Sequence, residues 1–237
     1  MKTEDIGGIK VFCDDVHKFG TDAVLLADFA KISSAKYACD MGTGCGIIPL
    51  LFCRDSKINI TAMDIQSSAI SLVEKAVEEN QLQGRLEPVL CDIRELDKSR
   101  FCKYDLVTMN PPYKKMGAGL MSDNDAVNIA RFEVKCTMDD AAKAAASLLM
   151  PSGRFCVCHR PERLADIFDS MRKHKIEPKR MRIVCQREGS EPMLVLVEGI
   201  RNGNVGMKIM SPLFVENKEG TYSDEMLRIH APWLEDK

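Results

Sequence analysis

From about residue 35 onward, short apolar runs alternate with longer amphipathic segments. Apolar residues recur at helical spacing in the longer segments, as at Ile70, Val73 and Val77, where Ser67 or Ser68 is the expected N-cap. The pattern predicts strands within 36–42, 58–64, 86–92, 104–110 and 154–159, a closing strand pair within 179–186 and 191–200, and helices within 22–31, 47–54, 67–82, 137–150 and 162–174. This alternation predicts an α/β fold, in which helices cover both faces of a mostly parallel sheet.

Three regions follow from this pattern. They are an N-terminal extension with one helix (1–34), a central α/β domain (35–200) and a loop-rich C-terminal extension (201–237). No apolar run resembles a signal peptide or a membrane span, so we expect a cytoplasmic protein that contacts no membrane. The ten cysteines lack a C-x-x-C pair and the four histidines lack ligand spacing, so we expect buried thiols and no metal.

The first predicted strand runs into a glycine-rich turn. Gly42, Gly44 and Gly46 alternate with other residues in "DMGTGCGII", and Ile47 stands where the dinucleotide fingerprint G-x-G-x-x-G has its third glycine. Glycine permits a positive φ and lets a ligand approach the backbone. The turn therefore favours a small-molecule ligand other than a dinucleotide, although a simple strand-to-helix turn would have the same spacing.

Three successive predicted strands end in an acid: Asp40, Asp64 and Asp92. Because parallel strands end at the same edge of a sheet, we expect these carboxylates to lie close together. Asp64 could accept hydrogen bonds from ribose hydroxyls and Asp92 from the exocyclic amine of an adenine. Each acid alone could instead be a helix N-cap. Together they favour a ligand that contains a nucleoside.

The fourth predicted strand ends abruptly at Asn110-Pro111-Pro112-Tyr113. Two prolines remove two backbone donors and fix φ, so no sheet ladder continues through them. The side-chain carbonyl of Asn110 and the backbone carbonyl of Pro111 could together orient a planar amine. Tyr113 could stack on its ring, which suits a base taken out of a helix. The alternative is a plain proline turn after a strand.

In this order the segments "DMGTGCG", "MD", "CDI" and "NPPY" resemble the class I S-adenosylmethionine-dependent methyltransferases. The resemblance covers about residues 20–200. It implies a Rossmann-like, seven-stranded, mostly parallel sheet with helices on both faces and an antiparallel last strand. It also implies S-adenosyl-L-methionine as cofactor, S-adenosyl-L-homocysteine as product and in-line methyl transfer to an amine at the N-P-P-Y turn. The implied cofactor-binding residues are Asp40, Gly42, Thr43, Gly44 and Gly46 at the methionine portion, Asp64 with Ile65 at the ribose, and Asp92 with Ile93 at the adenine.

Two further segments, 17–30 ("HKFGTDAVLLADFA") and 129–133 ("IARFE"), resemble the family of methyltransferases that modify N6 of adenine 37 in valine tRNA. The tail "SPLFVENKEGTYSDEM" resembles the bacterial members of that family. By this similarity Phe19, Thr21 and Asp22 close over the cofactor, and Arg131 and Glu133 line the substrate side. Thr21 and Asp22 could instead cap the first helix, and Arg131 and Glu133 could be surface charges.

The charge distribution is consistent with an RNA substrate. The whole chain has a net charge of −2, yet segment 154–187 holds ten Lys or Arg and four acids, a net charge of 10 − 4 = +6. Phosphate binding needs such a local basic patch, although a solvated helix face explains part of it. Lys114 and Lys115 follow the N-P-P-Y turn and are expected to contact phosphates beside a flipped base.

Rival functions differ in what else they require. A protein glutamine-N5 methyltransferase acting on release factors also has N-P-P-Y, but it usually carries a helical N-terminal domain, for which about 35 residues leave no room. A further alternative is another RNA or DNA amino-methyltransferase, of which the DNA enzymes commonly need a target-recognition domain. The intact N-P-P-Y argues against a non-catalytic cofactor-binding module, and Ile47 argues against a dinucleotide oxidoreductase. The sequence favours a tRNA adenine-N6 methyltransferase and is silent on oligomeric state.

Overall fold

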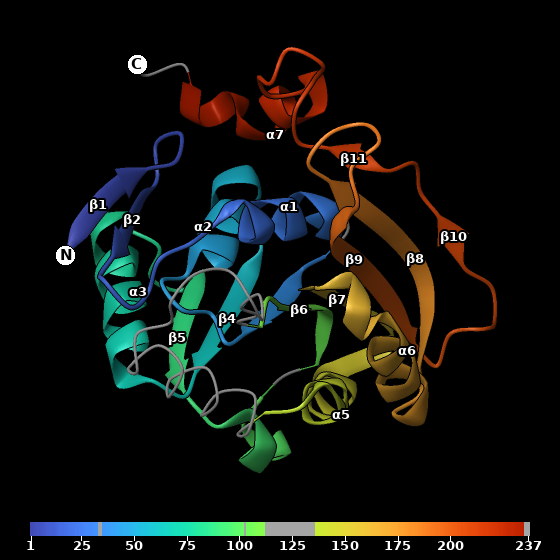
Figure 1. The fold of residues 1–237 in the computed structure, drawn as a ribbon. Helices are drawn as coiled ribbons and strands as arrows, with labels where there is room; N and C mark the ends of the chain where they lie inside the picture. Colours follow the sequence, from blue (N-terminus) through green and yellow to red (C-terminus); the bar gives the residue numbers. More distant parts are fainter. Residues whose placement is uncertain (33–34, 102, 112–135, 235–237) are drawn as a thin grey trace, which may run out of the picture.

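A mixed β-sheet forms the centre of the molecule (Figure 1), which a computed structural model describes for residues 1–32, 35–101, 103–111 and 136–234. The strands of this sheet are β3 (Tyr37–Met41), β4 (Asn59–Asp64), β5 (Leu86–Leu90), β6 (Tyr104–Met109), β7 (Leu149–His159), β8 (Ile176–Cys185), β9 (Pro192–Arg201), β10 (Lys208–Ile209) and β11 (Leu213–Phe214). Their spatial order is β10-β8-β9-β7-β6-β3-β4-β5, and β11 also pairs with β8.

The strand directions match the predicted fold class. Strands β3 to β7 run parallel to one another, whereas β9 runs antiparallel to both β7 and β8. The seven longer strands therefore form a mostly parallel sheet whose last strand in the chain is antiparallel, and β10 and β11 extend the edge beyond β8. The predicted Rossmann-like architecture is confirmed.

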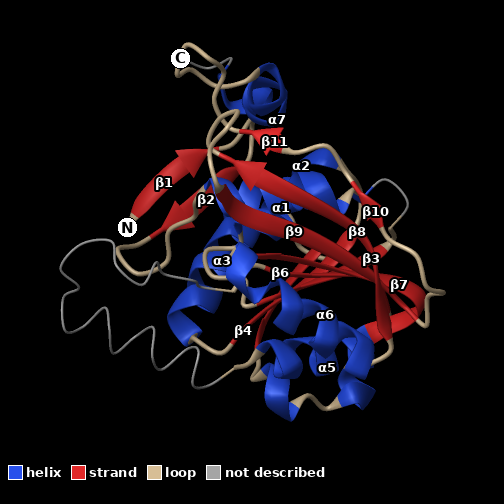
Figure 2. Cartoon of the chain, turned by 45° about the vertical axis from the view of Figure 1, so that its right-hand side comes forward, coloured by secondary structure: helices blue, strands red, loops and turns tan. Residues whose placement is uncertain are grey.

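Helices cover both faces of this sheet (Figures 1 and 2). Helices α1 (Thr21–Ala30), α2 (Ile47–Asp55) and α3 (Ser67–Glu79) pack on one face, and α5 (Met138–Leu148) and α6 (Leu164–Lys173) pack on the other. Successive strand residues point to opposite faces, so Ala38 lies in the first core and its neighbour Cys39 in the second. Both faces are buried, which explains why the strands read as continuous apolar runs.

Several elements differ from the sequence-based prediction. An N-terminal hairpin of β1 (Lys2–Asp5) and β2 (Lys10–Cys13) was not predicted; it is tied to α3 by two 2.8 Å hydrogen bonds between the Lys10 backbone and the Asn80 side chain. The C-terminal region contains helix α7 (Asp224–Leu234). The expected N-cap at Ser67 or Ser68 is wrong, because Gln66 occupies that position without a side-chain cap. Short 3₁₀ helices in the described part of the chain include η2 (Ile93–Glu95), η3 (Lys98–Arg100) and η4 (Pro161–Arg163).

The order of the strands places the site. From β3 the chain adds β4 and β5 on one side and then returns to place β6 on the other side of β3. Open α/β sheets bind ligands at such a switch, beyond the carboxyl ends of the strands. The glycine loop that follows β3 and the Asn110 turn that follows β6 therefore meet at one crevice. Among the described residues no helix is long and apolar enough to span a membrane.

Candidate active site

The glycine loop after β3 is held open by backbone conformation and by the end of β4. Gly42, Gly44 and Gly46 have φ of +68°, +55° and +79°. Residues other than glycine rarely adopt such positive values. The Thr43 N–H donates to the Met63 carbonyl at 2.9 Å. A Cβ at Gly42 or Gly44 would meet no heavy atom within 4 Å, so the backbone of the loop is accessible to a ligand.

Asp64, at the end of β4, is 3% exposed and organises this loop. Its Oδ2 accepts a hydrogen bond from the Gly44 N–H and its Oδ1 from the Gln66 N–H, both at 2.9 Å. Each carboxylate oxygen can accept a second hydrogen bond. Asp64 therefore keeps acceptor capacity for the hydroxyls of a ligand while it fixes the loop.

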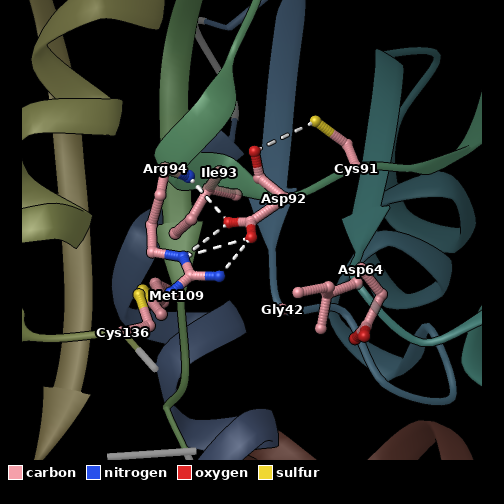
Figure 3. Close-up of a pocket in the computed structure, with 9 residues that line it drawn as sticks. Gly42, Asp64, Cys91, Asp92, Ile93, Arg94, Met109 and Cys136 are labelled. Atoms are coloured by element: carbon pink, nitrogen blue, oxygen red, sulfur yellow. Dashed lines mark hydrogen bonds and ion pairs between the residues drawn. The ribbon is translucent and has the colours of Figure 1, made fainter. Parts of the chain in front are cut away.

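A pocket opens at the carboxyl ends of β4, β5 and β6 (Figure 3). It encloses about 460 Å³ of space, part of it open to solvent. Its lining includes five residues of the predicted cofactor site, Gly42, Asp64, Ile65, Asp92 and Ile93, and four that were not predicted, Cys91, Arg94, Met109 and Cys136. Cys91, Arg94 and Met109 each lie within two residues of a predicted position, whereas Cys136 carries no local signal in the sequence.

Asp92 has two functions in the structure, one of which was the alternative that the sequence left open. It is the N-cap of η2 and accepts from the Arg94 N–H at 3.0 Å. Its carboxylate also faces the Arg94 guanidinium, whose Nε lies 2.9 and 3.1 Å from the two oxygens (Figure 3). An adenine amine at Asp92 would therefore share the carboxylate with Arg94.

Asp40 lies beneath the glycine loop and is 1% exposed. Burial raises the pKa of this carboxyl to about 7, against the opposing effect of a hydrogen bond from the Thr108 hydroxyl. That bond joins Thr108 Oγ1 to Asp40 Oδ1 at 2.6 Å, between neighbouring strands β3 and β6. Asp40 thus links the two strands from which the glycine loop and the Asn110 turn emerge.

The Asp40 titration gives a prediction about stability. Its pKa is about 7 in the folded protein and 3.8 ordinarily, so between these values the folded state keeps a proton that the unfolded state has released. We therefore expect the Asp40 contribution to the free energy of unfolding to fall as pH rises through this window. Denaturant unfolding from pH 5 to pH 8 should show a shallower fall for Asp40→Asn than for the wild type. Parallel curves for the two proteins would show that Asp40 is ionised throughout.

At the end of β6 the structure joins two predicted residues that are 88 positions apart. The Asn110 side chain donates from Nδ2 to Asp22 Oδ2 on α1 at 2.9 Å. Asn110 Oδ1 is buried and has no hydrogen-bond partner within the described part of the chain. Phe19 is half-buried and packs against the core under α1 to α3, and Thr21 opens α1. Pro112, Tyr113, Lys114, Lys115, Arg131 and Glu133 lie outside the described residues.

The basic segment 154–187 does not form the free cationic patch that its charge count suggests. Six of its ten cations lie in ion pairs: Arg154 and Arg180 with Glu198, Arg163 with Asp166, Arg172 with Glu177, Lys173 with Asp139, and Arg182 with Glu225. Three of these carboxylates belong to other segments of the chain, which a local count omits. The net charge of this segment therefore gives little support to an RNA-binding surface.

Comparison with known proteins places this site in a family. The family model described as "Methyltransferase small domain" matches residues 7–157, which span the glycine loop, Asp64, Asp92 and Asn110. The chain belongs to this family. This methyltransferase domain contains every predicted cofactor-binding residue and the whole N-P-P-Y turn.

Relatives with similar sequences agree with the family model. A protein named tRNA1(Val) (adenine(37)-N6)-methyltransferase from Flavobacteriaceae bacterium (strain 3519-10) is 30% identical over 93% of each chain. A protein of the same name from Phocaeicola vulgatus is 29% identical, over 90% of this chain and 88% of its own length. The resemblance seen in the sequence is thus confirmed.

Solved structures show the same fold. The structure of a predicted O-methyltransferase from Agrobacterium tumefaciens superposes with a TM-score of 0.68 at 16% identity, covering 89% of this chain and 96% of that chain. The N-methyltransferase NodS from Bradyrhizobium japonicum, solved with S-adenosyl-L-homocysteine, gives 0.54 at 12% identity, covering 80% and 90%. At these identities the likeness concerns the fold alone.

Proposed function

We propose that this methyltransferase transfers the methyl group of S-adenosyl-L-methionine to N6 of adenine 37 in valine tRNA. The names of its relatives support this substrate. The structural observation that carries the proposal is Asn110 Oδ1, a buried acceptor without a partner among the described residues, next to pocket residue Met109. A buried unsatisfied carbonyl is costly, and a donor from the substrate amine would satisfy it. A tRNA substrate also implies a cytoplasmic location.

The residues around the pocket fit the cofactor. The accessible backbone of Gly42 and Gly44 suits close approach of its methionine portion, Asp64 has acceptor capacity for ribose hydroxyls, and Asp92 offers a carboxylate to the adenine. When bound, S-adenosyl-L-methionine would supply a methyl group for in-line transfer, with its positively charged sulfur as the leaving group. The contribution of the protein is then placement and alignment.

Asn110 and Pro111 would orient the amine that receives the methyl group. The lone pair of an adenine N6 amine is delocalised into the ring and is a weak nucleophile. The Asn110 Oδ1 and the Pro111 carbonyl accept hydrogen bonds from the two N–H groups and so orient the amine. The lone pair is thereby directed out of conjugation, towards the methyl group. The methylated nitrogen is strongly acidic and loses its extra proton to water, so the neutral Asn110 suffices without a strong base.

The class of substrate is tested by offering tRNA, genomic DNA and a release factor in parallel with labelled S-adenosyl-L-methionine. We expect label in tRNA, recovered as N6-methyladenosine after digestion to nucleosides. Label confined to the protein would identify the glutamine-N5 alternative, and label confined to DNA would identify a DNA amino-methyltransferase. Either of these two results overturns the proposed substrate.

A further inference from the structure

We propose that Asp22 is a positioning residue that fixes the orientation of the Asn110 side-chain amide. The inference rests on the proposed function, because it assigns Asn110 Oδ1 to the substrate amine. By the sequence resemblance Asp22 was expected to close over the cofactor. The structure places its Oδ2 2.9 Å from Asn110 Nδ2, a contact that this expectation did not include.

The chemistry of this contact determines which end of the amide faces the substrate. An ionised carboxylate accepts hydrogen bonds and cannot donate them, so the NH2 end of Asn110 must face Asp22. The carbonyl end must then point the other way, as a buried acceptor. Without Asp22 the amide could rotate by half a turn, since its two ends have nearly the same shape. An NH2 group would then face the substrate amine, and two donors would oppose each other.

The residue before α1 makes room for this carboxylate. A Cβ at Gly20 would lie 2.6 Å from Asp22 Oδ1, closer than real contacts allow. Gly20 has φ −123° and ψ 177°, an extended conformation open to any residue, so the backbone itself does not require glycine. Glycine is required at this position because a larger residue would displace the Asp22 carboxylate. This second observation supports a defined position for that side chain.

The far end of α1 is also fixed, which keeps Asp22 in place. Arg154 donates to the carbonyls of Ala30 and Lys31 at 2.5 and 2.7 Å. Arg180 donates to the Phe29 carbonyl at 2.7 Å, and its guanidinium lies 4.2 Å from the centre of the Phe29 ring. The helix that carries Asp22 is thus anchored to β7 and β8, while Asp22 links its first turn to the end of β6.

The test compares Asp22→Ala, Gly20→Ala and Asp22→Asn. We expect Asp22→Ala to lower kcat by about 10- to 100-fold, the loss that follows from misplacing a reacting group, with unchanged affinity for S-adenosyl-L-homocysteine. Gly20→Ala keeps the charge but displaces the carboxylate, so it should lower kcat in the same way. Asp22→Asn can still accept from Asn110 Nδ2 and should recover part of the activity. The control is Asp28→Asn, which removes the charge of another acid on α1, one that pairs with Arg228. It should leave kcat unchanged.

Two further readouts separate positioning from other functions. In the Asn110→Ala background, Asp22→Ala should lower kcat no further, because Asp22 acts through Asn110. In the free protein, the side-chain amide NMR signals of Asn110, assigned by their loss in Asn110→Ala, should shift in Asp22→Ala and Gly20→Ala. These signals report on the contact even if tRNA proves not to be the substrate. Weaker S-adenosyl-L-homocysteine binding with an unchanged kcat, or unshifted amide signals, would overturn the proposal.

Discussion

Replacing Asn110 by alanine should reduce kcat for methyl transfer by at least about 10²-fold, the loss found when one preorganised polar group at a reacting centre is removed. The substitution deletes the buried Oδ1 acceptor and leaves the glycine loop and Asp64 untouched. Affinity for S-adenosyl-L-homocysteine, measured by calorimetry, should therefore stay near the wild-type value. A single-turnover assay at saturating cofactor measures the chemical step itself.

The control is Asn59→Ala, at an exposed asparagine that begins β4, at the end of that strand away from the pocket. It should leave both methyl transfer and cofactor affinity at the wild-type level. If Asn110→Ala loses cofactor binding to the same extent as activity, the N-P-P-Y turn is a structural element of the pocket and its assigned chemistry is wrong.

Of the substitutions proposed for this protein, Glu198→Ala should cause the largest loss of stability, about 3–5 kcal/mol in the free energy of unfolding. It leaves two largely buried guanidinium groups, whose side chains are 18% and 14% exposed, without their carboxylate. Glu198 is 7% exposed on β9. It accepts from Arg154 at 2.9 Å and from Arg180 at 2.8 Å. Burial raises the pKa of Glu198, but the two guanidinium groups outweigh it and hold the pKa below its usual value. The stabilisation is therefore present at neutral pH and is lost in acid.

Denaturant unfolding at pH 7 measures this loss. The matched control is Glu79→Ala, which breaks the exposed ion pair with Lys10 and should change stability little, as exposed pairs generally do. A Glu198→Ala protein as stable as the wild type would show that the two arginines are satisfied by the carbonyls at the end of α1. We also expect Glu198→Ala to lower the activity per folded molecule, because Arg154 and Arg180 anchor the helix that bears Asp22.

The central sheet and the helices over it could be predicted because both depend on local patterns. Each strand from β3 to β6 is a short apolar run that ends in polar or turn residues, and each helix has apolar residues at helical spacing. The hairpin strand β1 could not be predicted in this way, because all four of its residues are exposed and show no alternation. The hairpin is held instead by contacts between Lys10 and Asn80, far apart in the sequence.

The candidate site was predictable to the extent that parallel strands bring their ends together. Of the three strand-end acids that this rule grouped, Asp64 and Asp92 line one pocket, whereas Asp40 is buried and is not among its lining residues. The rule could not show that Arg94 shares the carboxylate of Asp92, nor that Asp22 binds Asn110, because such pairings depend on side-chain directions after folding. The charge count of segment 154–187 was incomplete for the same reason, because Arg154 and Arg180 pair with Glu198, outside the counted range.

The reaction proposed for the Asn110 site is methylation of N6 of adenine 37 in a valine tRNA. The most direct measurement is incubation of two valine tRNA transcripts, one with adenine and one with guanine at position 37, with the protein and labelled S-adenosyl-L-methionine. Nucleoside analysis of the products follows. We expect N6-methyladenosine in the adenine-37 transcript and none in the guanine-37 transcript. Equal labelling of both transcripts, or no labelling of either while S-adenosyl-L-homocysteine still binds, would show that the proposed reaction is wrong.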